Sequence, residues 1–235
     1  MKSFILVVTI ALLSCCNVDC KWWKDRSRGF HTEGTTESDP PEHTKLIEMA
    51  RYVLHNTDWA SIATISTLPT IQGFPFTNLK SIVDGSLANS TGIPYFYMSP
   101  LDFSARDLSK NSRATLLVSL EQTNFCEKMK YDPQDPRCTR LILSGKMKKV
   151  KNDTQEYVFA KAALFERHPD FVNYPSDHGW FVAKLKIVQI AMVDWFGGAQ
   201  YISVRDYLAY NYTGHEMLDY HERQESVNEL ARAAQ

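Results

Sequence analysis

Two strands of the expected fold lie in the stretch ATLLVSLEQTNFCEKMKYDPQDPRCTRLILSGKMKKV, Ala114 to Val150. It contains two runs rich in aliphatic and β-branched residues, ATLLVSLEQ and TRLILSGKMKKV, on either side of a loop that holds Cys126 and Cys138. Runs of this composition, bounded by residues such as Pro, Asp and Asn, are typical of β-strands. The sequence therefore predicts two strands connected through a cysteine loop.

Further strands are expected on both sides of this pair. They are the runs SIATIST (61–67), FPFTNLKSIVD (74–84), IPYFYMS (93–99) and GWFVAKLKIVQIAMVDWF (179–196). The last run is long enough to bend through two sheets. In IPYFYMS the aromatic residues alternate, so we expect one face of this strand to lie in the core and the other to form an interface or a pocket wall.

Three segments have the spacing of helices. PEHTKLIEMARYVLHNT (41–57) places Leu46, Met49, Ala50, Val53 and Leu54 at helical intervals, and FSARDLSKN (103–111) predicts a short helix. DTQEYVFAKAALFERHP (153–169) follows Asn152, which with Asp153 offers a cap, and sets Val158, Ala162 and Phe165 on one face. Six or more strands with few helices predict a mainly β fold with flanking helices (α+β), a closed or nearly closed antiparallel barrel.

The first residues have the pattern of a signal peptide. In MKSFILVVTIALLSCC, Lys2 precedes an apolar run from Phe4 to Leu13, which is shorter than the roughly 20 residues of a membrane-spanning helix. We expect residues 1–20 to be a signal peptide cleaved after Cys20, with Cys16 as the alternative position, and the chain to be secreted with no membrane span. A flexible leader (21–40), one domain (41–210) and a polar C-terminal tail (211–235) would follow.

Removal of this segment leaves two cysteines, which could form a metal site, a redox pair or a structural bridge. Eleven residues separate Cys126 from Cys138, which excludes a CxxC redox pair. A structural zinc site needs four ligands, and only two thiols are present. Because the secretory pathway is oxidising, we expect a disulfide between them.

Three Asn-x-Ser/Thr triplets also indicate the secretory pathway. They begin at Asn89 (NST), Asn152 (NDT) and Asn211 (NYT), each bordered by residues typical of turns or loops. We expect all three asparagines to carry glycans.

Charge and motifs disfavour several classes of function. The formal net charge is −1, and the lysines between residues 146 and 151 fall in a strand-like run, so nucleic-acid binding is not expected. The chain has no G-x-S-x-G, HExxH or GxGxxG motif, and Gly197-Gly198 in DWFGGAQ is interpreted as a turn. We expect no catalytic residue and no metal ligand.

Six segments of the chain, in their order, resemble the CREG glycoproteins, which are secreted relatives of flavin-binding split-barrel proteins. The matching segments are DWASIATIST, GIPYFYMSPLDFS, ATLLVSLEQTNFC, DPQDPRCTRLILSGK, LFERHP and WFVAKLKI…DWFGG, between about residues 41 and 203. The resemblance implies an FMN-binding split-barrel-like fold and a homodimer, with IPYFYMS offering the apolar strand face. It further implies secretion or residence in endosomes and lysosomes, and a role in growth control and differentiation without flavin or enzyme activity.

The flavin-binding relatives hold the cofactor phosphate with a serine and a basic residue in a pattern like S-x-K/R-x-x-L. The segment YFYMSPLDFSARDLSKN supplies Ser99, Ser104 and Arg106 as candidates for this role. In the alternative interpretation, Ser104 caps the short helix and Arg106 is solvated.

Two features lead us to expect no bound flavin. The insertion of Pro100 and Asp102 departs from the flavin pattern. The loop from Asn124 to Cys138 is expected to fold over the cleft in which the relatives hold the flavin. The principal hypothesis is a non-enzymatic secreted or lysosomal glycoprotein that acts in growth control, differentiation or lysosomal homeostasis by binding a receptor or other proteins. The alternative is an FMN-dependent oxidoreductase of the pyridoxamine-phosphate oxidase type.

Overall fold

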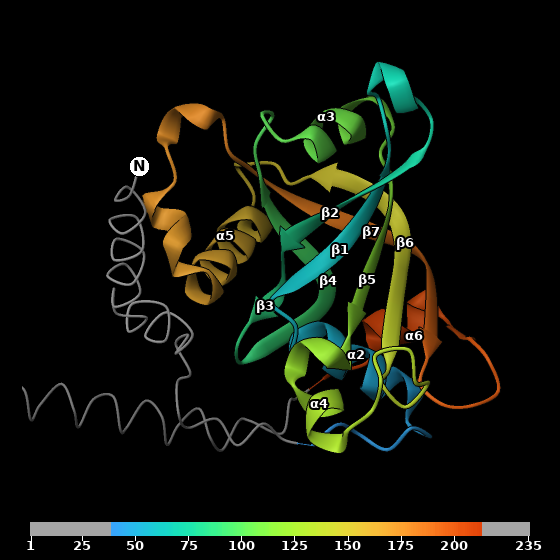
Figure 1. The fold of residues 1–235 in the computed structure, drawn as a ribbon. Coiled ribbons are helices and arrows are strands. Elements are labelled where there is room, and N and C mark those ends of the chain that lie inside the picture. Colours follow the sequence, from blue (N-terminus) through green and yellow to red (C-terminus); the bar gives the residue numbers. More distant parts are fainter. Residues whose placement is uncertain (1–38, 213–235) are drawn as a thin grey trace, which may run out of the picture. The chain divides into compact units, whose positions relative to one another are not determined.

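The computed structural model describes residues 39–212, in which eight strands form one antiparallel sheet (Figure 1). The expected signal peptide, most of the expected leader and the expected tail from residue 213 lie outside the described residues. The strands are β1 (Trp59–Ile65), β2 (Pro75–Ser81), β3 (Val83–Ser86), β4 (Asn89–Met98), β5 (Arg113–Ser119), β6 (Arg140–Lys149), β7 (Phe181–Val193) and β8 (Gln200–Ile202). Their order is β2-β1-β5-β6-β7-β4-β3, with β8 also paired to β7.

The sheet curls, and the two strands at its ends follow each other directly in the sequence. Strands β2 and β3 are the first and last of the order, yet they are separated in sequence by Ile82 alone. The Ile82 N–H donates to the Asp58 carbonyl at 2.9 Å, and the Ile82 side chain is fully buried. The predicted mainly β fold is therefore confirmed as a curled half-barrel with flanking helices.

The pleat of the strands separates a core face from an outer face. On β5, Ala114, Leu116 and Val118 are buried, whereas the residues between them are partly or fully exposed. The same alternation holds along β1 and most of β6. Since successive side chains of a strand point to opposite faces, each run contributes one apolar row to the interior.

Within residues 39–212, five α-helices and four short 3-10 helices flank the sheet. They are α2 (Leu46–His55), α3 (Phe103–Lys110), α4 (Phe125–Met129), α5 (Gln155–Arg167) and α6 (Val204–Ala209), with η1 (Pro69–Ile71), η2 (Leu120–Thr123), η3 (Pro169–Asn173) and η4 (Ser176–His178). Helix α2 begins five residues later than expected from Pro41, and its Met49, Val53 and Leu54 enter the main core.

Helix α5 covers the opposite side of β3 and β4 and forms a second apolar cluster. The prediction that Val158 lies on the face of α5 that packs on the sheet is wrong, because Val158 is 60% exposed. The buried residues of the helix are Ala160, Ala163 and Leu164. Small alanines at the contact allow the helix to approach the sheet closely. The cap is Thr154 rather than Asn152 or Asp153, and its hydroxyl accepts from the Tyr157 N–H at 3.2 Å.

Two expectations about strands are also wrong. The run 74–84 forms two strands rather than one, because Ile82 lies between β2 and β3. The long run after Gly179 remains in one sheet as β7, and a register shift opposite Ser144 and Gly145 accommodates its curvature. Gly145 is required there, since a Cβ atom would lie 2.3 Å from the Lys186 carbonyl oxygen.

A fully buried guanidinium ties α2 to the sheet and to α6. Arg51 is 1% exposed, and its Nη1 donates to the carbonyls of Tyr207 at 3.1 Å and Tyr210 at 2.8 Å. Its Nη2 donates to the Ser90 carbonyl at 2.7 Å and hydroxyl at 2.9 Å. Gly92 has a φ of +73°, and a Cβ there would lie 2.8 Å from Arg51 Nε. The guanidinium can therefore occupy its position beside β4 only because residue 92 is glycine.

The same network contains a buried carboxylate. Asp84, 1% exposed, accepts from His55 Nδ1 at 2.7 Å, from the Gly92 N–H at 3.2 Å and from the Ser90 hydroxyl. Burial by itself would raise the pKa of Asp84. The hydrogen bonds from His55 and Ser90 and the nearby positive charges outweigh it and lower the pKa.

This shift predicts that Asp84 stabilises the fold in a pH-dependent way. Because its pKa is lower in the folded chain, the contribution is complete above the unfolded value of about 3.9 and is lost as the pH falls through the folded pKa. We expect Asp84→Asn to reduce the free energy of unfolding by about 2 kcal/mol at pH 7, with a smaller difference in acid. Urea titrations at neutral and acidic pH measure it. Asp170→Asn, at an exposed position, is the matched control, and equal effects of both variants would contradict the prediction.

Candidate functional site

The three residues considered for phosphate binding are placed at the start of α3, but two of their side chains already have internal partners. Ser99 is 4% exposed, and its hydroxyl donates to the His178 carbonyl at 2.7 Å. The Ser104 hydroxyl is fully buried and accepts from Asn78 Nδ2 at 3.0 Å. Arg106 is exposed. The two serine hydroxyls therefore point into the protein, whereas the arginine lies at the surface.

A carboxylate of the protein itself occupies the anion position of α3. Asp102 caps the helix by accepting from the Ser104 N–H at 2.9 Å, and it also accepts from Asn78 Nδ2 at 3.3 Å. Lys80 forms an ion pair with its other oxygen. Asn78 and Lys80 are two residues apart on β2 and so share one face of the strand. Together these groups bind an anion as a phosphate site would.

Lys80 completes this arrangement from a partly buried position. Burial lowers the pKa of the Lys80 ammonium to about 8, so the group remains charged at neutral pH while its pairing with Asp102 offsets the cost of desolvation. The expectation that Ser104 is the cap is wrong, because Asp102 lies one residue before the helix and supplies the cap. No local pattern in the sequence marked Asn78 or Lys80 as part of this site. An Asp directly before a predicted helix was the available signal for Asp102.

The cysteine loop lies at the opposite end of the half-barrel from α3 (Figure 1). Within one chain, the expectation that this loop folds over the cleft at α3 is therefore wrong. The loop instead continues from η2 through α4, and its residues Phe125 and Tyr131 pack against the core near α2. The reason is that the loop connects the ends of β5 and β6 that lie away from α3.

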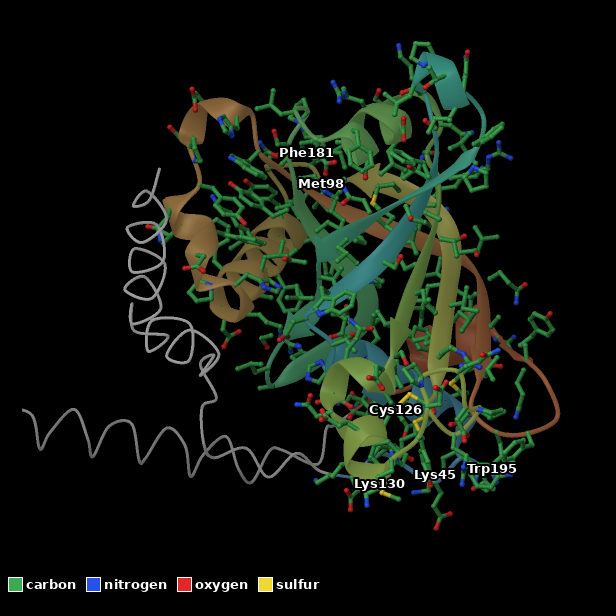
Figure 2. The ribbon with its side chains drawn as sticks, viewed as in Figure 1. Lys45, Met98, Cys126, Lys130, Phe181 and Trp195 are labelled. Carbon is green, nitrogen blue, oxygen red and sulfur yellow. A yellow bond between two sulfur atoms is a disulfide. The ribbon has the colours of Figure 1, made fainter. Side chains whose placement is uncertain are left out.

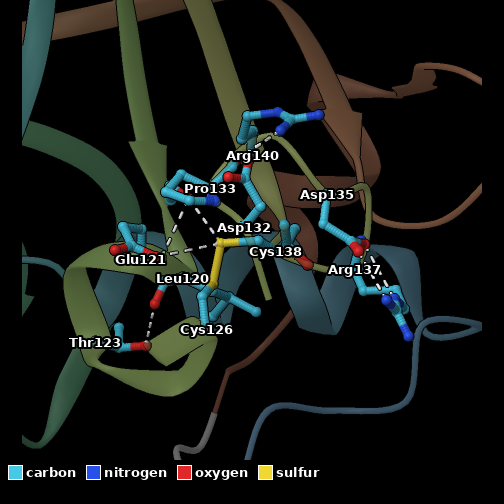
Figure 3. The surroundings of a disulfide bond; sticks show 12 residues. Leu120, Glu121, Thr123, Cys126, Asp132, Pro133, Asp135, Arg137, Cys138 and Arg140 are labelled. Carbon is cyan, nitrogen blue, oxygen red and sulfur yellow. Dashed lines mark hydrogen bonds and ion pairs between the residues drawn. A yellow bond between two sulfur atoms is a disulfide. The ribbon is translucent and has the colours of Figure 1, made fainter. Parts of the chain in front are cut away.

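The structure joins Cys126 and Cys138 in a disulfide, with a Cα–Cα distance of 5.5 Å (Figure 3). Both residues are fully buried. Hydrogen bonds within the loop add to this link, since Arg137 forms two bonds to the Asp135 carboxylate, at 3.0 and 2.7 Å, and Arg140 donates to the Pro133 carbonyl at 2.8 Å. The loop is thus held as a compact unit against the core.

The outer face of the sheet carries a mostly apolar row with exposed large side chains. The strand registers align six residues across β2, β1, β5, β6, β7 and β8, namely Leu79, Ser61, Leu117, Ile142, Ala191 and Tyr201. Leu79 is 61%, Leu117 40% and Tyr201 73% exposed. We refer to these six residues as the outer row.

A hollow of about 440 Å³ lies beside the outer row, between β1, β5, β6 and β7. Its walls are mostly apolar, and Arg113 and Lys146 stand directly opposite each other on β5 and β6 at its edge. Like charges in this arrangement repel each other, so an anionic group would be favoured there.

The strand face expected to meet a second copy is not available. In β4, Phe96 and Met98 lie in the main core, while Tyr95 and Tyr97 pack against the residues of α5 and η3. The Tyr97 ring lies 5.2 Å from Phe165 between centroids. The alternation expected for these aromatics is therefore present, but both faces of the strand are covered.

The buried network around Asp84 contains a serine, a histidine and an aspartate, yet it lacks the geometry of a hydrolase triad. The Ser90 hydroxyl contacts the carboxylate instead of the imidazole. The second imidazole nitrogen of His55 is 3.1 Å from the Leu87 carbonyl. The serine hydroxyl of this network does not contact the imidazole, which a triad requires. The network serves to hold α2, β3 and β4 together.

The three candidate glycosylation residues are all exposed. Asn89 begins β4 directly after a tight turn, Asn152 lies in the turn before α5, and Asn211 follows α6. Among residues 39–212, none of the helices has the length and apolar content needed to cross a membrane.

Comparison with solved structures gives the same architecture. The heme binding protein from Mycobacterium smegmatis superposes with a TM-score of 0.55 at 19% identity, over 73% of this chain and 62% of that one. The protein Atu2129 from Agrobacterium tumefaciens gives 0.53 at 22% identity, over 74% and 64%. At these identities the likeness concerns the fold alone. The expected split-barrel-like fold is confirmed.

Sequence comparison is more specific. Human Protein CREG1 is 43% identical over 188 residues, which cover 80% of this chain and 84% of that protein. Protein CREG1 of Gallus gallus is 45% identical over 170 residues, 72% and 86% of the two chains. Human Protein CREG2 is 42% identical over 174 residues, 74% of this chain and 59% of that protein. The family model described as "CREG, beta-barrel" matches residues 41–209. The chain therefore belongs to the CREG family.

Proposed function

We propose that this protein is a secreted or lysosomal glycoprotein that acts as a homodimer by binding other proteins, without flavin and without catalysis. Growth control, differentiation or lysosomal homeostasis would be the processes it serves. Family membership supports the proposal, as do the exposed glycan acceptors and the outer row. The single observation that carries it is the Asp102 carboxylate at the start of α3.

This carboxylate opposes phosphate binding on electrostatic grounds. A flavin mononucleotide phosphate is a dianion, and the loss of its hydration must be offset by charge-assisted hydrogen bonds. Here the Ser104 N–H, Asn78 and Lys80 already bind Asp102. A phosphate at this position would have to displace the carboxylate or lie beside it, and like charges at contact repel strongly.

We expect flavin mononucleotide not to bind the wild-type protein at low micromolar concentration. Titration followed by flavin fluorescence measures this, and purified protein should be colourless. Asp102→Asn removes the competing charge with little change in shape, so this variant should bind inorganic phosphate more tightly than the wild type. Saturable flavin binding to the wild type that Arg106→Ala abolishes would contradict the proposal.

An FMN-dependent oxidoreductase of the pyridoxamine-phosphate oxidase type is the second candidate. One observation favours it, namely the hollow of about 440 Å³ with Arg113 and Lys146 at its edge, which could attract a phosphate to the outer face instead of α3. The same titration distinguishes the candidates. Saturable binding lost in Arg113→Ala and Lys146→Ala, but retained in Arg106→Ala, would favour this second function.

The homodimer is proposed through the outer row. Three large side chains of this row are exposed on a regular sheet, and burying them against a second copy would remove apolar area from water. Obligate dimers usually bury roughly 2,000 Å² or more in total, which a face of six strands can supply.

We expect Leu117→Glu to convert the dimer into a monomer, because a charge placed at the centre of the interface would be buried without a partner. Sedimentation velocity at micromolar concentration measures the change. Val172→Glu, at a 71% exposed position on η3, is the matched control and should remain dimeric. A wild-type protein that sediments only as a monomer would exclude this interface.

Glycosylation of Asn89, Asn152 and Asn211 is proposed for protein made in animal cells. All three side chains are exposed, so an oligosaccharide can extend into solvent. Treatment with a peptide N-glycosidase should lower the mass of the secreted protein. Each Asn→Gln variant should lack the mass of one glycan. An unchanged mass after treatment would show that the acceptors are unused.

A further inference from the structure

A second hollow, of about 120 Å³, lies at the end of the half-barrel that carries the cysteine loop. Its walls come from the segment before α2, from α2 itself, from the cysteine loop and from the residues that follow β7. Figure 2 shows Cys126 and Trp195 at this same end of the molecule. The hollow is thus remote from α3, none of its lining residues belongs to the outer row, and it does not depend on the proposed function.

A buried carboxylate faces this hollow. Asp194 is 2% exposed, and its Oδ1 accepts from the Thr139 hydroxyl at 2.5 Å. Its Oδ2 has no hydrogen-bond partner among residues 39–212. Burial raises the pKa of this carboxyl, and the hydrogen bond from Thr139 and the charge of His43 only partly oppose the increase. The charged form of a carboxylate that is desolvated in this way is stabilised most by a cation that contacts its second oxygen.

The position of the carboxyl group is fixed through the disulfide. Thr139 is fully buried, directly follows Cys138, and its carbonyl accepts from the Leu120 N–H at 3.0 Å. The hydroxyl that orients Asp194 therefore belongs to a residue that is anchored on both sides. This arrangement is preorganised, which reduces the entropic cost of binding a ligand.

The remaining walls are aromatic or apolar and include Met49, Leu120, Phe125, Tyr131 and Trp195. The Trp195 ring is stacked on His43 with 4.4 Å between centroids. Arg137, at the edge of the hollow, is already paired with Asp135 and lies over the Tyr131 ring, with Cζ 4.1 Å from its centroid. Its positive charge is therefore already engaged. Aromatic faces beside a carboxylate favour a cation.

The size of the hollow limits which cation can enter. A volume of about 120 Å³ corresponds to roughly four water molecules at about 30 Å³ each. A primary ammonium with a short methylene chain matches this volume, with the ammonium at Asp194 and the methylenes along the rings. An anion would meet the uncompensated carboxylate and be repelled.

We propose that this hollow binds a primary alkylammonium group, with Asp194 accepting its hydrogen bond and Trp195 and the neighbouring rings contacting its methylenes. The group could come from a small free amine or from a lysine side chain of another protein. Both sources present the same chemistry to the site.

Titration with n-butylammonium chloride tests the proposal at neutral pH, with the Trp195 indole N–H resonance as the local readout. We expect saturable binding with a Kd on the order of 1 mM, reasonable for a ligand of five heavy atoms. Sodium chloride controls for ionic strength and n-butanol for apolar contact. Asp194→Asn should weaken binding by about tenfold or more, as expected for loss of a charge-assisted hydrogen bond.

Trp195→Ala should also weaken binding, as measured by calorimetry, and it tests the site if Asp194→Asn does not fold. Phe74→Ala is the matched control, since this aromatic residue is 62% exposed and does not line the hollow. Reduction of the disulfide should weaken binding because it releases Thr139. Unchanged affinity in Asp194→Asn, equal binding of n-butanol, or no saturable shift would each overturn the proposal.

A second ligand distinguishes the two sources of the ammonium group. Nα-acetyl-lysine methylamide presents the amine as a protein would, and its norleucine analogue lacks the charge. Binding of the lysine derivative as tight as that of n-butylammonium, with none by the norleucine analogue, supports a lysine of a partner protein. Binding of n-butylammonium alone supports a small amine.

Discussion

The buried guanidinium of Arg51 is the interaction on which the arrangement of this half-barrel depends. It carries a positive charge into the interior and donates to carbonyls near the end of α6 and to Ser90 on β4. Asp84 lies in the same network and accepts from His55 on α2. Burying charges of this kind is unfavourable unless hydrogen bonds surround them. The network therefore fixes α2, β3, β4 and α6 in one mutual arrangement.

A second constraint holds the two ends of the curled sheet near each other. Strands β2 and β3 end the sheet order and are connected through Ile82, so the chain itself holds the two ends together. Helix α2 fills the interior with Met49, Val53 and Leu54. Apolar burial supplies most of the stabilisation, but it is not directional and does not fix how the elements are oriented. The hydrogen bonds of the polar network fix that orientation.

The start of α3 shows how the hydrogen-bond donors at a helix N-terminus can be satisfied within the chain. The donors at this position bind Asp102, which lies in the sequence directly before the helix. The carboxylate gives the helix its cap and gives Lys80 its partner. Chemistry that could bind an external anion is thereby used within the chain.

The sequence by itself determined the features that depend on near neighbours along the chain. The alternation of apolar residues located β5 and β6, helical spacing located α2, α3 and α5, and the count and spacing of cysteines indicated the disulfide. These patterns are set by the periods of the strand and the helix, which are local properties of the backbone. The motifs in their order were also sufficient to identify the family.

Only the tertiary structure decided which of these elements meet. The outer row exists because hydrogen-bond registers align residues from six strands, and a change of one residue in any register would break it. The cysteine loop lies away from α3 because of the ends of β5 and β6 that it connects. Asn78 and Lys80 reach Asp102, and Thr139 reaches Asp194, across long intervals of sequence. Such contacts depend on packing between distant segments, and no local pattern in the sequence records them.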